Sequence, residues 1–200
     1  KEKPTVVAWV IDESGSMDAV RKRLAESVAK LRANSEKGTT VSWTVSGFSE
    51  QLHVLAPRPL TDMAAVSRAV RKVANDPSGK ENVFTAVHQT TQQLKKLTAN
   101  GDKKGIIVVV TNEQGDDRQG LENAIAVCKR SGIRVFCLGH AAPFGTEKSF
   151  VRIKFEDGFV QETPVDSGAE TAILTVLKMP NLGGAPIEPG RLSSGFGPWA

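Results

Sequence analysis

Two apolar runs constrain what this chain can fold into more than any other feature of its sequence. Residues 6–11 read Val-Val-Ala-Trp-Val-Ile, and residues 106–110 read Ile-Ile-Val-Val-Val. A strand with one face in water alternates between apolar and polar residues, whereas a strand buried on both faces is apolar throughout. Both runs therefore predict strands inside a sheet that is covered on its two faces.

The rest of the sequence supplies elements that complete such a sheet. Apolar residues recur at helical spacing in residues 18–33, 61–73, 82–98 and 120–131, and a last short helix is predicted at 168–178. Further strands are predicted at 39–49, 51–56 and 133–139. Buried strands separated by amphipathic helices predict an α/β fold with an open, mostly parallel central sheet and helices on both faces.

The C-terminal part of the sequence has a different character. Residues 149–165 alternate on both sides of Asp157-Gly158, which predicts a β-hairpin. Residues 181–200 are rich in Gly, Pro and Ser. We therefore expect one domain over residues 1–180, followed by a tail at 181–200 that leads to a further region.

Composition narrows the classes of partner. The formal net charge of +4 is modest, and the basic stretches 21–23 and 71–72 fall in predicted helices, where we expect them to face solvent. Aromatic residues do not interleave with them, so nucleic acid is not the predicted partner. No apolar run approaches the ~20 residues that span a bilayer. Cys128 and Cys137 are predicted to be small buried thiols, although a disulfide and hence the redox compartment stay open.

Polar residues follow both apolar runs. Asp12, Ser14 and Ser16 come directly after the first, and Thr111, Asn112 and Glu113 come after the second. Parallel strands end at the same edge of a sheet, here called the carboxyl rim, where ligands of open α/β sheets bind. One carboxylate and two hydroxyls at alternate positions are suited to a hard cation, because such ions prefer oxygen ligands.

The sequence "DESGSM" at residues 12–17 contains the pattern Asp-x-Ser-x-Ser. Together with the preceding buried strand, "ENVFTA" at 81–86 and "VVVTN" at 108–112, it resembles the von Willebrand factor A domains of bacterial type over roughly residues 4–178. The resemblance implies a metal-ion-dependent adhesion site that binds Mg²⁺, or Mn²⁺ or Ca²⁺. It also implies a protein ligand that approaches the ion with an acidic side chain.

Two positions depart from the family pattern. Glu81 stands where the family has a threonine, and Asn112 stands where it has an aspartate. Glutamate and amide oxygens both suit hard cations, so the predicted metal site comprises Asp12, Ser14, Ser16, Glu81 and Asn112. Asp116 and Asp117 lie near enough in sequence to assist through water.

Three interpretations follow from these residues. The first is a metal-dependent protein-binding domain of a larger protein. The second is a structural scaffold with a degenerate rim, in which Asn112 and Glu81 bond to the serines without an ion, or the serines cap the next helix. The third, hydrolysis by a metal and the acidic loop, lacks a nucleophile–base pair, so the protein is not predicted to be an enzyme. The resemblance and a start without methionine favour an extracytoplasmic location, while the partner and the oligomeric state stay open.

Overall fold

The computed structural model describes residues 3–30, 40–112 and 115–138, together with three two-residue strands further along the chain. The elements follow the order β1 (Thr5–Asp12), α1 (Asp18–Lys30), β2 (Val41–Phe48), β3 (Leu52–Leu60), α2 (Met63–Arg71), α3 (Val83–Leu97), β4 (Lys104–Val110), α4 (Leu121–Ser131) and β5 (Arg134–Leu138). The short strands are β6 (Lys154–Phe155), β7 (Gly158–Phe159) and β8 (Glu162–Thr163). Single 3-10 turns lie at Gly15–Met17 and Arg118–Gly120.

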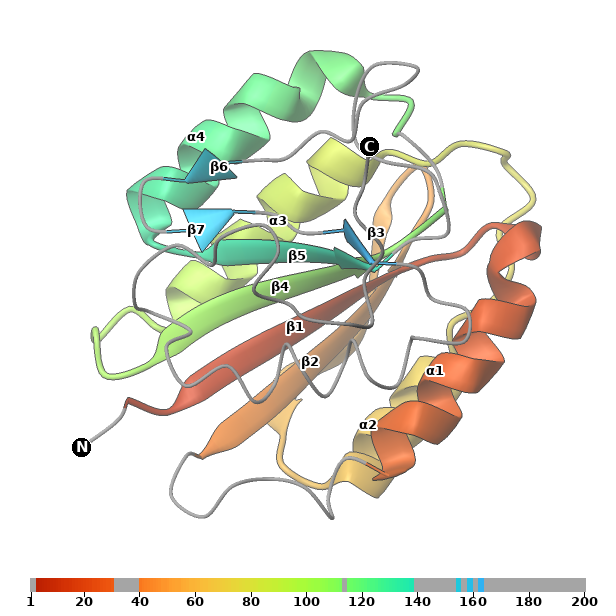
Figure 1. Ribbon diagram of the computed structural model, residues 1–200, viewed down its shortest axis with the longest axis horizontal. Helices are drawn as coiled ribbons and strands as arrows, with labels where there is room; N and C mark the ends of the chain where they lie inside the picture. Colours follow the sequence, from red (N-terminus) through yellow and green to blue (C-terminus); the bar gives the residue numbers. More distant parts are fainter. Residues whose placement is uncertain are drawn as a thin grey trace.

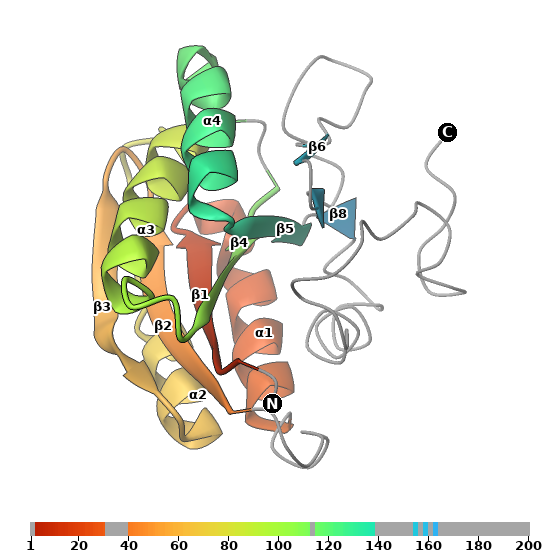
Figure 2. The same ribbon diagram turned by 90° about the vertical axis from the view of Figure 1, so that its left-hand side faces the viewer.

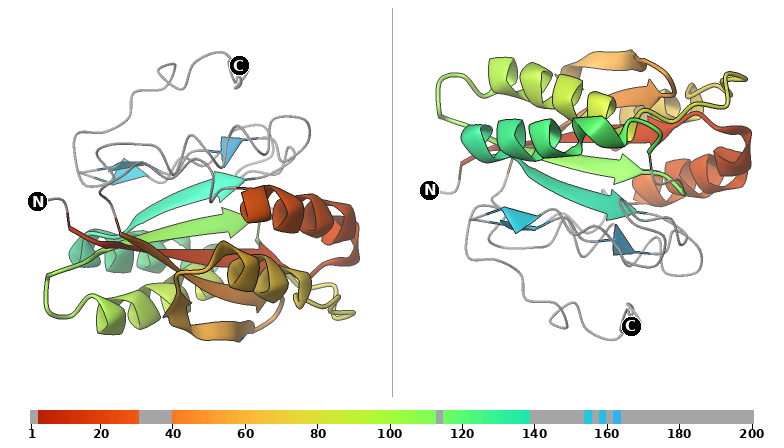
Figure 3. Two further views of the ribbon diagram at one scale, coloured as in Figure 1. Left: turned by 90° about the horizontal axis from the view of Figure 1, so that it is seen from below. Right: turned by 90° about the horizontal axis from the view of Figure 1, so that it is seen from above.

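The strands form a sheet with the order β3-β2-β1-β4-β5-β8, in which only the β2–β3 pair is antiparallel. Helices α1 and α2 pack side by side on one face, and α3 and α4 cover the other (Figures 1 and 3). Figure 2 shows the same arrangement from a second direction, with α3 and α4 in the upper part of the view and α1 and α2 in the lower part. The predicted open, mostly parallel α/β architecture is confirmed.

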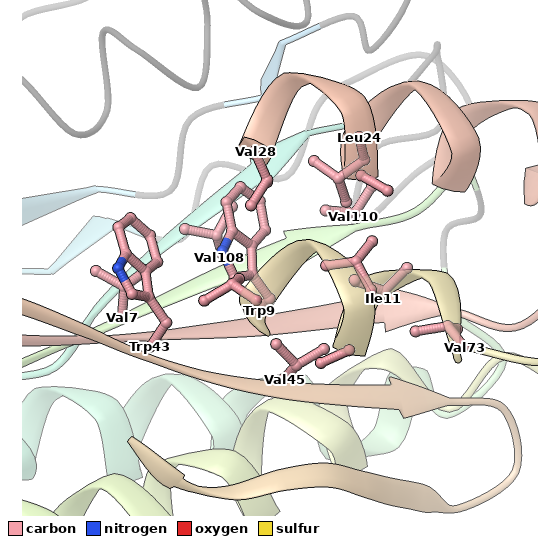
Figure 4. Packing of buried hydrophobic residues seen from close by; sticks show 14 of the residues in the cluster. Val7, Trp9, Ile11, Leu24, Val28, Trp43, Val45, Val73, Val108 and Val110 are labelled. Carbon is pink, nitrogen blue, oxygen red and sulfur yellow. The ribbon is translucent and has the colours of Figure 1, made fainter. Parts of the chain in front are cut away.

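The core consists of two apolar clusters, one on each face of the sheet. Val7, Trp9 and Ile11 of β1 point into the cluster under α1 and α2, while Val6 and Val10 point into the cluster under α3 and α4. The indole rings of Trp9 and Trp43 stack in the first cluster with their centroids 6.2 Å apart (Figure 4). Both faces of β1 are therefore buried, which explains its uninterrupted apolar sequence.

Strand β3 extends further than the sequence predicts. The expected strand ended at residue 56, but β3 continues to Leu60 through Pro57 and Pro59. Proline has no N–H to donate, so it is tolerated in a strand only at an edge or a bulge. Both conditions hold here, because β3 is the outer strand beside β2 and the register of that pair shifts near Val45.

The described part of the predicted C-terminal hairpin is the antiparallel pair of β6 and β7. The predicted helix at 168–178 and the tail at 181–200 lie outside the described residues. Cys128 and Cys137 are both buried thiols, and burial raises the pKa of Cys128 to about 11. Within the described ranges, no helix has the length and apolar character needed to cross a membrane.

Candidate metal centre

Asp12 is the last residue of β1 and the anchor of the carboxyl rim. Its side chain is fully buried, and both carboxylate oxygens accept a hydrogen bond. The Ser14 backbone N–H donates to Oδ1 at 2.7 Å, and the Thr111 hydroxyl donates to Oδ2 at 2.6 Å. The carboxylate is thus held by the loop that follows β1 and by the residue that follows β4.

Ser14, Ser16 and Asn112 form a short chain of polar contacts beside this carboxylate. The two serine hydroxyl oxygens lie 3.1 Å apart. The Asn112 amide nitrogen donates to the Ser16 hydroxyl at 3.2 Å, and Asn112 Oδ1 lies 3.4 Å from the same oxygen. Ser14 precedes the 3-10 turn without a capping bond from its side chain. The structure therefore brings four of the five predicted residues together. The hydroxyls of the two serines bond to each other and to Asn112 rather than to a helix end.

Glu81, the fifth predicted residue, is placed by its backbone. It precedes α3, and its N–H donates to Asp116 Oδ2 at 2.9 Å while its C=O accepts from the Asp116 N–H at 2.9 Å. Asp116 belongs to the loop that leads from Asn112 to α4. Glu81 is therefore tied to the same loop as Asn112, through the carboxylate and the backbone N–H of Asp116.

Asp117 has a role that the sequence did not reveal. Its buried carboxylate accepts hydrogen bonds from the N–H groups of Phe84 at 3.1 Å and Thr85 at 2.6 Å. These N–H groups belong to the first turn of α3, whose own N-cap residue, Asn82, makes no capping bond with its side chain. Because a helix leaves its first N–H groups without intrahelical partners, Asp117 caps α3 from another loop.

A glycine lets that loop approach the helix. Gly115 has φ +81, and a Cβ at this position would lie 3.0 Å from Cβ of Val83. Such a backbone angle and such a close approach both favour glycine. Neither the bend nor the cap has a local sequence signature beyond the glycine itself, which is why the role of Asp117 was missed.

Arg21 corrects the prediction that the basic stretch 21–23 faces solvent. Its side chain is buried, and Nη1 donates to the backbone oxygens of Asp12 at 2.9 Å and Ser14 at 2.8 Å. Its Nη2 donates to the side-chain oxygen of Asn75. The spacing Met17, Arg21, Leu24 could have revealed this, since it places Arg21 on the buried stripe of α1.

Glu13, between two of the predicted ligands, points away from them. Its carboxylate is nearly buried and lies 2.6 Å from Nδ1 of half-exposed His53 in β3. Gly47 makes room for it, because a Cβ on Gly47 would collide with the Glu13 side chain. Burial raises the pKa of Glu13, and the contact with His53 partly offsets this rise.

The four gathered residues could bind an ion only through oxygen atoms, and they carry one formal negative charge. In the described part of the chain, no group of three or more His, Cys, Asp or Glu residues could hold a metal, so an ion here would rely on hydroxyl and amide oxygens. That donor set fits a hard cation such as Mg²⁺, which keeps several waters and uses one or two carboxylates. The Asn112–Ser16 bond shows equally that the rim can satisfy its own polar groups.

Three solved structures illustrate the similarity of this fold to known proteins. A von Willebrand factor type A protein from Catenulispora acidiphila has a TM-score of 0.62 at 15% identity, over 88% of this chain and 42% of that one. An aerotolerance-related membrane protein from Bacteroides fragilis has a TM-score of 0.60 at 19% identity, over 86% and 98%. Proximal thread matrix protein 1 from the mussel byssus, described with a zinc-occupied MIDAS (metal-ion-dependent adhesion site) motif, has a TM-score of 0.59 at 12% identity. The match covers 87% of this chain and 46% of that one.

These identities are low enough that the structural matches establish the fold alone. The chain spans less than half of the Catenulispora and byssus chains. A search of curated protein sequences finds no match. The family model for the von Willebrand factor type A domain, however, matches residues 7–160, which include most of β1, all of β2, β3, β4 and β5, and the rim residues described above. The chain belongs to the von Willebrand factor type A domain family.

Proposed function

We propose that this domain binds a protein partner through a divalent cation at the carboxyl rim. Von Willebrand factor type A domains often mediate protein interactions. The observation that supports the metal-dependent form of the proposal is a set of contacts at the rim: Asp12 Oδ1 accepts from the Ser14 N–H, and the Ser16 hydroxyl contacts the Ser14 hydroxyl and the Asn112 amide. The ion would be Mg²⁺ or Mn²⁺, or the larger Ca²⁺, since each accepts an all-oxygen donor set.

Each rim residue has a distinct part in this proposal. Among the four gathered residues Asp12 supplies the one charged ligand, and its bonds to the Ser14 N–H and the Thr111 hydroxyl fix the direction of its oxygens. Arg21 holds the loop behind it by bonding the carbonyl oxygens of Asp12 and Ser14. When bound, a divalent ion held by so little negative charge stays attractive to an acidic side chain of the partner.

Glu81 is proposed to tune the site. A second carboxylate near the ion would strengthen ion binding and weaken the attraction for a partner's acid, because it neutralises part of the ion's charge. Asn112 acts in the opposite sense, since it supplies an oxygen without a charge. We therefore expect Glu81→Thr to bind the ion more weakly and Asn112→Asp to bind it more tightly.

The test is a calorimetric titration of the protein with Mg²⁺ and with Mn²⁺. Asp12→Asn removes the buried charge, and Asp102→Asn is the matched control because it makes the same change of charge at an exposed position outside the rim. We expect binding in the parent and the control, and its loss in Asp12→Asn. Binding that persists in Asp12→Asn would contradict the proposed ligand set.

The second candidate is a scaffold domain with a metal-free rim. The bond between the Asn112 amide and the Ser16 hydroxyl favours it, because these groups are satisfied without an ion. Absence of Mg²⁺ and Mn²⁺ binding in the parent would select this candidate.

Binding rather than catalysis is proposed in either case. The hydroxyls of Ser14 and Ser16 contact each other and the Asn112 amide, while His53 contacts Glu13, so the rim as described does not pair a nucleophile with a base. We also propose an extracytoplasmic location, which the description of the similar Bacteroides fragilis chain as a membrane protein supports.

A further inference from the structure

The end of the sheet opposite the candidate metal centre carries a concentration of positive charge. Here β1 and β4 begin, with Thr5 paired to Lys104, and here α3 and α4 end (Figure 1). Six exposed basic side chains from three segments define this surface, which we call the basic end: Lys3, Lys95, Lys96, Lys103, Lys129 and Arg130. The segments that carry them, residues 3–4, 95–104 and 129–132, contain one acidic residue, Asp102.

Backbone and side-chain contacts hold the three segments beside one another. The Lys104 N–H donates to the C=O of Pro4 at 2.8 Å, and Lys3 Nζ donates to the C=O of Gly101 at 2.7 Å. The end of α4 reaches the same place, because a Cβ on Gly105 would lie 3.2 Å from the side chain of Ile133. The six charges therefore belong to one surface although they are far apart in sequence.

Local structure accounts for only part of this concentration. Basic residues in the last turn of a helix interact favourably with the helix dipole. This accounts for Lys95 and Lys96 in α3 and for Lys129 and Arg130 at the end of α4. Lys3 and Lys103 lie outside both helices. The basic end carries more net positive charge than the +4 of the whole chain, so the rest of the protein is net acidic.

The chemistry of the basic end selects among anionic partners. Five of its six basic residues are lysines, and lysine is depleted in protein–protein interfaces. Such interfaces also depend on large side chains that insert into the partner. In the residues that the structure describes, the one exposed large apolar side chain is Val54 in β3. Every Trp or Phe side chain whose burial the structure describes is buried, so this part of the chain offers single-stranded nucleic acid no stacking surface.

We propose that the basic end binds the headgroups of an anionic lipid membrane. A diffuse anionic surface needs no pocket, apolar anchor or stacking platform, and it attracts clustered lysines by charge alone. Bound in this way, the domain would hold the carboxyl rim at the far end of strands about 25 Å long, on the side away from the lipid. The proposal does not require a bound cation at the rim.

The test is sedimentation of the protein with phosphatidylcholine vesicles that contain or lack phosphatidylglycerol, in EDTA so that the metal proposal plays no part. The variant Lys95→Gln/Lys103→Gln/Lys129→Gln neutralises one position in each of α3, the turn before β4 and α4. The matched control Arg23→Gln/Arg71→Gln/Lys72→Gln makes the same change of charge at exposed positions in and next to α1 and α2. Circular dichroism establishes that both variants fold.

We expect the parent to sediment only with the anionic vesicles and less so as salt rises. Each lysine near such a surface contributes roughly a fivefold factor, so the first variant should bind on the order of 100-fold more weakly. The control should stay within a few fold of the parent. Equal losses in both variants, no binding of the parent, or binding to soluble heparin or DNA but not to vesicles would each overturn the proposal.

Discussion

At the scale of single residues, two buried threonine hydroxyls differ in whether they have a hydrogen-bond partner, so their contributions to stability can be compared directly. The Thr111 hydroxyl donates to Asp12 Oδ2 at 2.6 Å, whereas the buried Thr90 hydroxyl in α3 has no hydrogen-bond partner in the described part of the chain. A buried acceptor that loses its donor costs about 1–3 kcal/mol, while replacing an unsatisfied hydroxyl by a methyl group is neutral or stabilising. We predict that Thr111→Val lowers the free energy of unfolding by about 1–3 kcal/mol and that Thr90→Val leaves it unchanged or raises it. Urea unfolding in EDTA measures both, and equal effects would show that the contact with Asp12 contributes nothing.

Glu13 provides a prediction about pH. Burial raises its pKa above the ordinary 4.5, so the folded state binds this proton more tightly than the unfolded state does. The stabilisation that results is complete below 4.5 and is lost as the pH rises through the folded pKa. Glu13→Gln lacks this titration, so its unfolding free energy relative to the parent should increase across that interval. Unfolding of both proteins over a pH series, in EDTA, measures the difference, and a constant difference would contradict the direction of the shift.

At the scale of the elements, α3 is the helix whose start depends on another part of the chain. Asp117 accepts from the N–H groups of Phe84 and Thr85, as Asp62 does from those of Ala64 and Ala65 at the start of α2. Asp62 precedes its helix directly and is exposed, whereas Asp117 is buried and comes from a distant loop.

We therefore predict that Asp117→Ala is the more costly of two matched cap removals. Loss of an N-cap side chain costs about 0.5–2 kcal/mol, and a buried N–H left without an acceptor adds to that cost. Chemical unfolding should give the lower value for Asp62→Ala and a value of at least 2 kcal/mol for Asp117→Ala. An equal or smaller loss for Asp117→Ala would mean that water replaces its carboxylate at the helix start.

Most elements could be predicted from sequence because their signals are local. The apolar run of β1 and the Asp62 cap of α2 each lie within a few residues of the structure they specify. The extension of β3 through Pro57 could not be predicted, since it depends on β3 being an edge strand. The burial of Arg21 could be predicted only in part. Its position in the helix indicated burial, but its charge argued against it.

At the scale of the whole molecule, topology assembles the candidate site. Asp12 and Asn112 are far apart in sequence, yet β1 and β4 are parallel neighbours, so their carboxyl ends meet. That convergence followed from the sequence once two doubly buried strands were recognised. The connection between Glu81 and the loop after β4 did not, because it depends on the backbone conformation of Gly115 and on the direction of two carboxylates.

The same connection leads to a prediction about how an ion at the rim would affect distant backbone. If an ion binds the rim, an opening that releases it becomes harder by about 2.7 kcal/mol when its concentration is a hundred times the Kd. Asp116 and Asp117 tie the loop after β4 to the backbone N–H groups of Glu81, Phe84 and Thr85. Mg²⁺ should therefore slow hydrogen exchange at these three amides as well as at Ser14.

The capped amides of Ala64 and Ala65 are the internal control for this measurement. They occupy the equivalent positions of α2, which begins at the other end of the sheet, where Leu60 pairs with Trp43. We expect them to exchange by fraying of an exposed helix start, so Mg²⁺ should leave their exchange unchanged. Asp117→Ala should abolish the Mg²⁺ effect at Phe84 and Thr85 while preserving it at Ser14. Slowing confined to residues 12–17 and 112 in the parent would show that the two loops respond independently, and that Asp117 stabilises α3 without linking it to the rim.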